Sequence, residues 1–218
     1  MKIEVIRRID FSELERKVRE VPLRGKDFDG KEIRVYEHAH ISLRTMHPDE
    51  VNPTTFYLLR SNLEFQRALR EHLMSTQGID TLNLEGALEI LNEKGELWTL
   101  TPPIIEVTPR LVRYQPKEGE IYYRDVVKVQ IPIINDGAHR IALARELGIL
   151  FRALFISGAD ENFPFYAHPN EWSRTKVVDF VPSDKRDKKF YSREDCYALY
   201  RDFGVLGCGA PRILGSKS

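Results

Sequence analysis

The sequence predicts an α+β protein, in which strands and helices are mixed along the chain. Segments rich in β-branched and aromatic residues alternate with segments whose apolar residues recur at helical spacing. A strand–turn–helix–strand unit lies near the centre of the chain, and its last strand, Ile149–Ile156, is almost continuously apolar, as expected for a strand covered on both faces. Hydrophobic residues make up 42% and charged residues 30% of the 218 positions, which is typical of a globular domain.

The first segments are predicted to be short strands and one helix. Ile3–Ile6 has the pattern of a strand, and either Asp10 or Ser12 can cap a helix that extends to Val18. Glu32–Leu43 is rich in β-branched and aromatic residues, so we expect one or two strands there.

Two helices are predicted next. Thr54 or Thr55 can cap the longest helical pattern of the chain, which Gly78 ends. A second helix is expected over Leu84–Asn92, with Gly95 as the residue that terminates it.

The remainder is predicted to alternate strands with a central helix. Gly137 marks the change from strand to helix, and Gly148 ends that helix. An irregular stretch is expected after Gly158, and a loosely held tail after residue 203. The other predicted segments are the strands Ile104–Val107, Leu111–Tyr114, Ile121–Ile134 and Lys176–Val181, a turn at 116–120, and a last helix over Ser192–Phe203.

We expect these elements to form one compact unit with three parts. Residues 1–83 would form N-terminal strands and a helical elaboration, residues 84–182 the core, and residues 183–218 a C-terminal helix and tail.

Charge and composition narrow the function classes. The 33 basic residues balance 33 acidic residues, whereas proteins that neutralise many DNA phosphates usually carry a basic excess. The first residues lack the apolar core of a signal peptide, and no apolar run reaches the roughly 18 residues that cross a bilayer. The two cysteines have neither a metal-ligand spacing nor a disulfide framework. We therefore expect a cytoplasmic protein without a membrane partner.

The motif Asp136-Gly137-Ala138-His139-Arg140 carries the clearest chemistry. It places a glycine turn between a buried strand and a helix, whose first backbone N–H groups attract anions. Gly137 allows close approach of a ligand, Arg140 can bind phosphate oxygens with two hydrogen bonds, and His139 can donate a proton. Asp136 can hold Mg²⁺, a hydroxyl group or His139. The same string also fits an ordinary turn with solvated His and Arg side chains.

The context of the motif resembles the ParB/sulfiredoxin-like superfamily. The run EILNEKGELWTLTPPIIEV, further strands, and then IINDGAHRIALARELGILFRALFI have that superfamily's order of elements between Glu89 and Gly158. This resemblance implies a ParB/sulfiredoxin-like mixed sheet with flanking helices, to which the N-terminal helical part is an elaboration.

Differences between this motif and the motifs of individual groups in the superfamily show which group the chain resembles most. Ala138 stands where sulfiredoxins carry a catalytic cysteine, so sulfinic acid chemistry is not expected. ParB proteins that bind CTP and slide on DNA have an acidic-Arg-Arg version of the motif and a helix-turn-helix domain, for which this chain has no clear counterpart. The Asp-Gly-x-His-Arg version is most similar to that of the free amino-acid (serine) kinases, although Ala138 stands where those often have a second histidine.

The kinase resemblance implies ATP or ADP as nucleotide, with CTP as a further candidate, together with Mg²⁺. It implies that Gly137, Ala138, His139 and Arg140 bind the phosphates, that Asp136 holds the metal, and that Asp136 and His139 take part in catalysis. These kinases carry a functional glutamate in an early loop, which makes Glu50 the first candidate for a third catalytic residue.

Asp49 is the second candidate for that early-loop acid. A solvated acid near the start of a helix is the alternative interpretation of Glu50. The irregular stretch after Gly158 offers a substrate site, because His168, Trp172 and Arg174 combine polar groups with an aromatic wall. Trp172 also fits the pattern of a core anchor.

The sequence therefore supports more than one function. The first is a nucleoside-phosphate-binding protein acting as a nucleotide-dependent kinase or phosphohydrolase on a small hydroxyl-bearing substrate such as an amino acid. The second is a ParB-like nucleic-acid or CTP-binding regulatory module, helped by the basic segment 184–189, although nucleic acid is not favoured. The third is a non-catalytic interaction scaffold. The pattern leaves the oligomeric state open.

Overall fold

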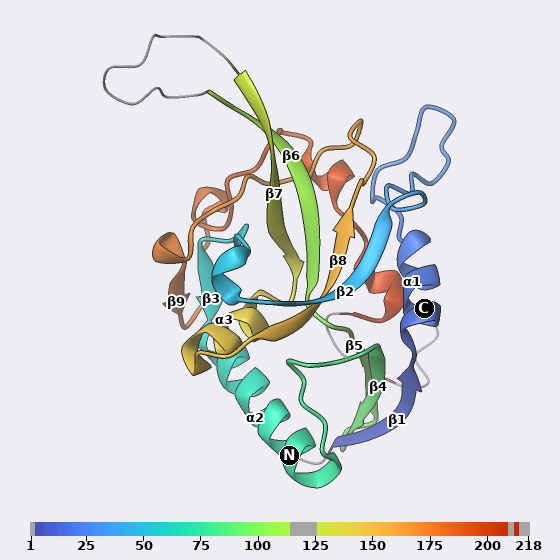
Figure 1. Cartoon of the computed structure of the whole chain (residues 1–218), viewed down its shortest axis with the longest axis vertical. Helices are drawn as coiled ribbons and strands as arrows, with labels where there is room; N and C mark the ends of the chain where they lie inside the picture. Colours follow the sequence, from blue (N-terminus) through green and yellow to red (C-terminus); the bar gives the residue numbers. More distant parts are fainter. Residues whose placement is uncertain (1–2, 114–125, 209–211, 214–218) are drawn as a thin grey trace.

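The computed structural model describes residues 3–113, 126–208 and 212–213, in which three α-helices pack against three sheets (Figure 1). The central sheet has the strand order β2–β8–β6–β7; β6 and β8 run parallel and the other neighbours antiparallel. The chain is therefore α+β with a mixed sheet, which confirms the predicted fold class. The strands of this sheet are β2 (His40–Met46), β6 (Ile104–Arg113), β7 (Val126–Asp136) and β8 (Phe151–Ser157).

The central sheet separates two cores because side chains alternate between its faces. On β6, Ile104 points into a core that α1 (Phe11–Arg19) covers, whereas Ile105 points into a core that α3 (Ala138–Leu147) covers. Both isoleucines are fully buried. Burying such a side chain contributes about 1.5–3 kcal/mol, so both faces of the sheet stabilise the fold.

A second sheet lies beside the first and packs against the longest helix. Its strand order is β1–β4–β5–β10, and Leu69 and Leu73 of the helix pack into its core with Ile90 and Trp98. A third, two-stranded sheet pairs β3 with β9 in parallel. These elements are β1 (Ile3–Ile9), β3 (Tyr57–Leu59), α2 (Arg60–Gln77), β4 (Ala87–Asn92), β5 (Glu96–Leu100), β9 (Lys176–Val178) and β10 (Arg212–Ile213).

The predicted helix over Leu84–Asn92 is wrong, because most of this segment is strand β4. β4 pairs with β1 on one side and with β5 on the other, so its backbone groups are used in the sheet. A tight turn joins β4 to β5: the side chain of Asn92 accepts hydrogen bonds from the backbone of Lys94 and Glu96, and Gly95 adopts a φ of 76°. Sheet pairing with distant residues overrode a local pattern that fits either structure.

The predicted α-helix over Ser192–Phe203 is also wrong. The segment contains the short 3₁₀ helices η4 (Cys196–Leu199) and η5 (Phe203–Leu206), with Arg201 between them. The backbone of Arg201 bridges to Leu23, and its side chain enters the core beneath the central sheet. These long-range contacts hold the chain too extended for a helix. The other 3₁₀ helices are η1 (Pro48–Glu50), η2 (Trp172–Arg174) and η3 (Lys185–Asp187).

Several predicted boundaries differ from those of the structure. Asp10 caps α1 by accepting a hydrogen bond from the backbone of Glu13 at 2.8 Å, so one of the two predicted caps is confirmed. Neither Thr54 nor Thr55 caps α2, because their hydroxyls donate to backbone carbonyls and the helix starts only after Leu59. Within the predicted Glu32–Leu43 strand region, β2 begins at His40.

Some predictions fall on residues that the structure does not describe. These are the turn at 116–120, the first part of the strand predicted over Ile121–Ile134, and much of the tail. In the described part of the chain, no helix combines the length and the apolar character that a membrane span requires.

Candidate functional site

The predicted strand–glycine–helix turn is present at the centre of the molecule. β7 ends at Asp136, Gly137 adopts a φ of 87°, and α3 starts at Ala138. A Cβ atom at Gly137 would lie 2.9 Å from the Pro103 side chain and 3.2 Å from Nη2 of Arg140. Glycine is thus required both by the backbone conformation and by the close packing. No side chain caps this end of α3, so its first N–H groups remain available to an anion.

Arg140 is a buried cation directed at this turn. The residue is 5% exposed, its Nη1 donates to the backbone oxygen of Thr101, and its Nη2 donates to Oδ2 of Asp136 at 3.5 Å. Burial lowers the pKa of Arg140, and the nearby Asp136 carboxylate acts in the opposite direction. Arginine nevertheless keeps its charge at neutral pH. The long bond to Asp136 leaves the guanidinium able to bind an additional anion.

His139 is held in one orientation by a backbone hydrogen bond. Its Nε2 accepts a hydrogen bond from the N–H of Leu59 at 3.0 Å, which joins α3 to the segment before α2. Burial lowers the pKa of His139, with Asp136 opposing the effect. An imidazole that accepts at Nε2 is neutral and carries its proton on Nδ1. His139 can therefore donate a hydrogen bond through Nδ1, while Nε2 has a structural role.

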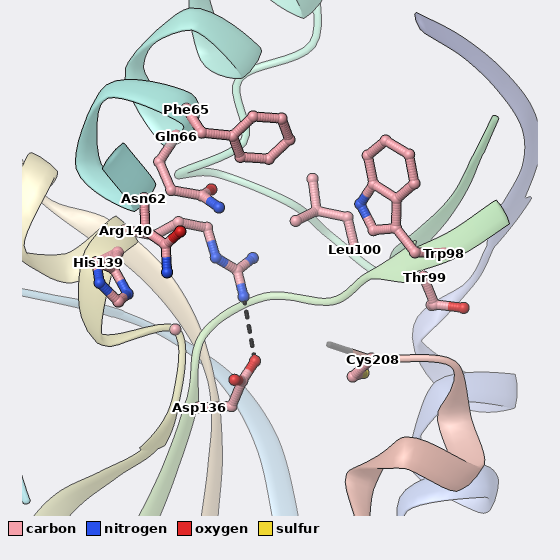
Figure 2. Close-up of a pocket in the computed structure, with 11 residues that line it drawn as sticks. Asn62, Phe65, Gln66, Trp98, Thr99, Leu100, Asp136, His139, Arg140 and Cys208 are labelled. Atoms are coloured by element: carbon pink, nitrogen blue, oxygen red, sulfur yellow. Dashed lines mark hydrogen bonds and ion pairs between the residues drawn. The ribbon is translucent and has the colours of Figure 1, made fainter. Parts of the chain in front are cut away.

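These residues line a cavity of about 590 Å³, which we call the motif cavity (Figure 2). Ligand pockets usually measure roughly 300–1,000 Å³, and the volume of the motif cavity lies within this range. Asp136, Gly137, His139 and Arg140 form one end, and α2 and β5 form the opposite walls. The remaining lining residues are Asn62, Phe65, Gln66, Trp98, Thr99, Leu100 and Cys208.

The structure does not bring Glu50 to the motif cavity. The Oε2 atom of Glu50 accepts a hydrogen bond from the backbone N–H of His47 at 2.7 Å and so closes a capping box around η1. Asp49 pairs with Arg145 at 2.8 Å on the outer part of α3. Neither acid lines the motif cavity. The carboxylates of this early loop serve local structure and the docking of α3.

The three predicted substrate residues also lie outside the motif cavity. Trp172 donates through Nε1 to the carbonyl oxygens of Pro48 and Val51, at 3.0 and 3.1 Å, which matches the alternative interpretation as an anchor. His168 packs its ring 4.6 Å from the ring of Phe190. Ala138, predicted at the phosphates, packs against the two apolar clusters beside α3 and does not line the cavity.

Arg174 lines a second cavity of about 530 Å³, which we call the basic cavity. Its cations Arg174, Lys176 and Arg186 form no side-chain hydrogen bond or ion pair with any described residue. Phe56 and Tyr57 supply aromatic rings. The basic cavity could have been suspected from the cations of 184–189, but its aromatic part could not.

The sequence did not identify the α2 and β5 walls of the motif cavity. Asn62, Phe65 and Gln66 have the i, i+3, i+4 spacing that places side chains on one face of a helix. That spacing shows which residues share a face but not what the face meets. The described residues contain no cluster of three or more His, Cys, Asp or Glu side chains that could hold a metal ion. Asp136 is the one carboxylate in the described lining of the motif cavity.

Comparison with known proteins places most of the chain in one family. A family model described as the ParB CE domain matches residues 13–178. No curated protein and no solved structure gives a significant match. The matched range begins in α1 and ends with β9, so it includes α2, β5 and the Asp136–Arg140 motif. It is therefore much longer than the Glu89–Gly158 segment that carries the sequence resemblance.

Proposed function

The chain belongs to the ParB CE domain family, and on that premise we propose that it binds a nucleoside phosphate in the motif cavity. The convergence of Arg140, Gly137 and the uncapped start of α3 on one cavity carries this proposal. The charge of Arg140 is buried and therefore weakly screened by water, which strengthens its attraction for phosphate oxygens. The helix dipole adds to that attraction at the same place.

Calorimetric titration with ATP, ADP and CTP tests the phosphate cradle. Arg140→Lys keeps the positive charge but removes the two-pronged guanidinium, so we expect nucleotide affinity to fall about tenfold or more. Arg145→Lys is the matched control: it makes the same change on the same helix, at a half-exposed side chain that does not line the motif cavity. Nucleotide affinity equal to wild type in Arg140→Lys would refute the cradle.

Asp136 is the proposed contact for Mg²⁺. This ion commonly uses one or two protein carboxylates together with phosphate oxygens and water, so a single carboxylate beside a bound phosphate suits it. Asp136→Asn should weaken nucleotide binding when Mg²⁺ is present. Without Mg²⁺ the same change removes a negative charge next to the phosphates and should strengthen binding. Titrations with Mg²⁺ and with a chelator measure the change in nucleotide affinity under both conditions. If Asp136→Asn changed the affinity in the same direction in both, Asp136 would not be a contact for the metal.

Phosphoryl transfer to a small hydroxyl-bearing substrate such as serine is the finer form of the proposal. It requires a group that positions the attacking hydroxyl in addition to the phosphate cradle. Asp136 and the Nδ1 side of His139 are the available groups in the described lining. Incubation with ATP and serine, followed by phosphorus NMR, would detect the phosphorylated product. Nucleotide binding without turnover of any hydroxyl compound would favour a regulatory module.

Single-stranded nucleic acid is a second candidate ligand, favoured by the basic cavity alone. The lining combines three cations with one carboxylate, Asp187, and with aromatic rings, and this excess of positive charge suits a phosphate backbone with stacked bases. A gel shift at low salt should then weaken in Arg186→Gln but not in Arg193→Gln, whose arginine is already paired with Asp195. The same retardation for both variants, or none for wild type, would remove this candidate.

A further inference from the structure

The wall of the motif cavity opposite Asp136 combines aromatic rings with carboxamides. Phe65 and Gln66 project from α2, and Trp98 and Leu100 from β5, above the Arg140–Asp136 pair, and Asn62 of α2 lies beside Arg140 (Figure 2). This composition differs from that of the motif end, which has the charged side chains of Asp136 and Arg140, backbone amides and the imidazole of His139. The cavity therefore has one end suited to an anion and one suited to a flat, uncharged group.

The carboxamides on this wall form no hydrogen bond with the rest of the described chain. The side chain of Asn62 forms no hydrogen bond with a described residue. The Oε1 atom of Gln66 is enclosed and also has no partner among the described residues. An enclosed acceptor without a donor destabilises a protein, so this acceptor beside the cavity favours a ligand that donates a hydrogen bond to it. Gln66 lines the motif cavity, and in Figure 2 its carboxamide points from α2 into the space between α2 and β5.

The aromatic rings supply a surface for stacking. Phe65 is 40% exposed, and it lies on the cavity wall rather than in a core. The Trp98 residue is 7% exposed, so its indole is firmly held while one part of it faces the cavity. Aromatic side chains bind nucleobases by stacking on their faces, and planar amides of Asn and Gln bind base edges by paired hydrogen bonds.

We infer that this wall recognises a nucleobase that carries an exocyclic amino group, as adenine and cytosine do. The base stacks on Phe65, and its amino group donates to Oε1 of Gln66 while Nε2 donates to the adjacent ring nitrogen. The partnerless atom is an acceptor, and for this reason an amino group fits better than the carbonyl oxygen of hypoxanthine or uracil. The inference rests on the proposed function, because it assigns the part of the nucleotide that the phosphate cradle does not contact.

Titration calorimetry with matched ligands tests the inference on the whole chain. The ligands are ATP against ITP and CTP against UTP, which exchange an amino group for a carbonyl oxygen, and inorganic tripolyphosphate, which has no base. In wild type we expect at least one nucleotide with an amino-bearing base to bind about tenfold more tightly than its carbonyl partner and than tripolyphosphate. Phe65→Ala should weaken the binding of nucleotides and leave the affinity for tripolyphosphate unchanged.

Gln66→Leu should abolish the preference for the amino-bearing base without changing the affinity for tripolyphosphate. Gln77→Leu is the control, since it makes the same change at an exposed position at the end of α2, outside the motif cavity. Equal binding of amino and carbonyl bases by wild type, or a preference that survives in Gln66→Leu, would overturn the base assignment.

The two proposals fail in different ways. If tripolyphosphate binds as tightly as every nucleotide and Arg140→Lys weakens both, the phosphate cradle stands and the base wall is refuted. If nucleotides bind with the Gln66-dependent preference but Arg140→Lys has no effect, the base wall stands and the cradle is refuted. If neither nucleotides nor tripolyphosphate bind, both are refuted.

Discussion

At the scale of single residues, His139 combines a structural hydrogen bond with a place in the lining of the motif cavity. Its Nε2 must stay deprotonated to accept the hydrogen bond from Leu59, and its position beside Asp136 and Arg140 puts it at the cavity. Protonation would remove the acceptor and place a positive charge on a half-buried side chain. His139 therefore stabilises the fold at neutral pH, where the imidazole is uncharged. Under the same conditions its Nδ1 proton is available as a hydrogen-bond donor.

The lowered pKa of His139 predicts a pH dependence of folding. In the unfolded chain histidine titrates near about 6.5, so below that pH the unfolded state binds more protons than the folded state. The stability contributed by neutral His139 is complete above about 6.5 and is lost as the pH falls toward the lower folded pKa. Urea denaturation between these limits should show the free energy of unfolding falling by at most about 1.4 kcal/mol per pH unit for this group.

His139→Gln separates this effect from other groups, because its amide oxygen can still accept from Leu59. We expect the free energy of unfolding of this variant to fall less steeply than that of wild type as the pH decreases. His168, whose pKa is also lowered mainly by burial, contributes to the rest, so His168→Gln serves as the comparison. If the free energy of unfolding of His139→Gln fell with decreasing pH as steeply as that of wild type, His139 would not contribute to the pH dependence.

At the scale of elements, α3 begins and ends at glycines with positive φ, and the two ends differ in their surroundings. Gly137 has a φ of 87° and is packed against Pro103, whereas Gly148 has a φ of 65° with no neighbouring atom in the space a Cβ would occupy. The sequence alone shows a glycine at each end. The packing decides that one end is crowded and directed at a cavity and that the other is open.

This asymmetry predicts different costs for the same substitution. Gly148→Ala should cost about 1–2 kcal/mol, the usual penalty for placing a Cβ in a left-handed conformation. Gly137→Ala should cost more, because its Cβ would also meet the backbone of Pro103 at 3.0 Å. Denaturant unfolding measures both. In addition, only Gly137→Ala should weaken nucleotide binding, because it displaces Arg140. Equal stability losses and equal affinities in the two variants would show that the crowding has no effect.

At the scale of the whole molecule, a buried ionic cluster joins the C-terminal segment to the central sheet. Arg201 donates to both oxygens of Glu106, at 3.1 and 2.8 Å, and Tyr36 donates its hydroxyl to the same carboxylate at 2.5 Å. Burial, followed by the charge of Glu106, raises the pKa of Tyr36 well above its ordinary value, so its hydroxyl remains a donor. The guanidinium also donates to the carbonyl oxygens of Phe163, Pro164 and Leu199.

Removing the charge of Glu106 should strongly destabilise the fold. Glu106→Gln leaves Arg201 buried without a counter-charge, and breaking such a pair costs about 3–5 kcal/mol. Glu161→Gln is the control, since Glu161 pairs with Lys128 at 2.6 Å with both side chains about half exposed. Exposed pairs contribute at most about 1 kcal/mol, so the control should unfold close to wild type. Denaturant midpoints measure the difference, and similar losses in both variants would show that burial of the pair is unimportant.

The sequence alone was enough to predict the mixed α and β composition and the turn from β7 through Gly137 into α3. It also placed the candidate site residues Asp136, His139 and Arg140 in a single motif at that turn. Those features depend on periodicity, glycine conformation and capping, which act between neighbours along the chain. Tertiary contacts make most of Leu84–Asn92 a strand and place two short 3₁₀ helices, with Arg201 between them, where a last α-helix was expected. They also leave Glu50, His168 and Trp172 outside the motif cavity. The same contacts bring Gln66 and Trp98 to face Arg140. Such contacts arise from pairing and packing between segments far apart in the chain, which local patterns do not encode.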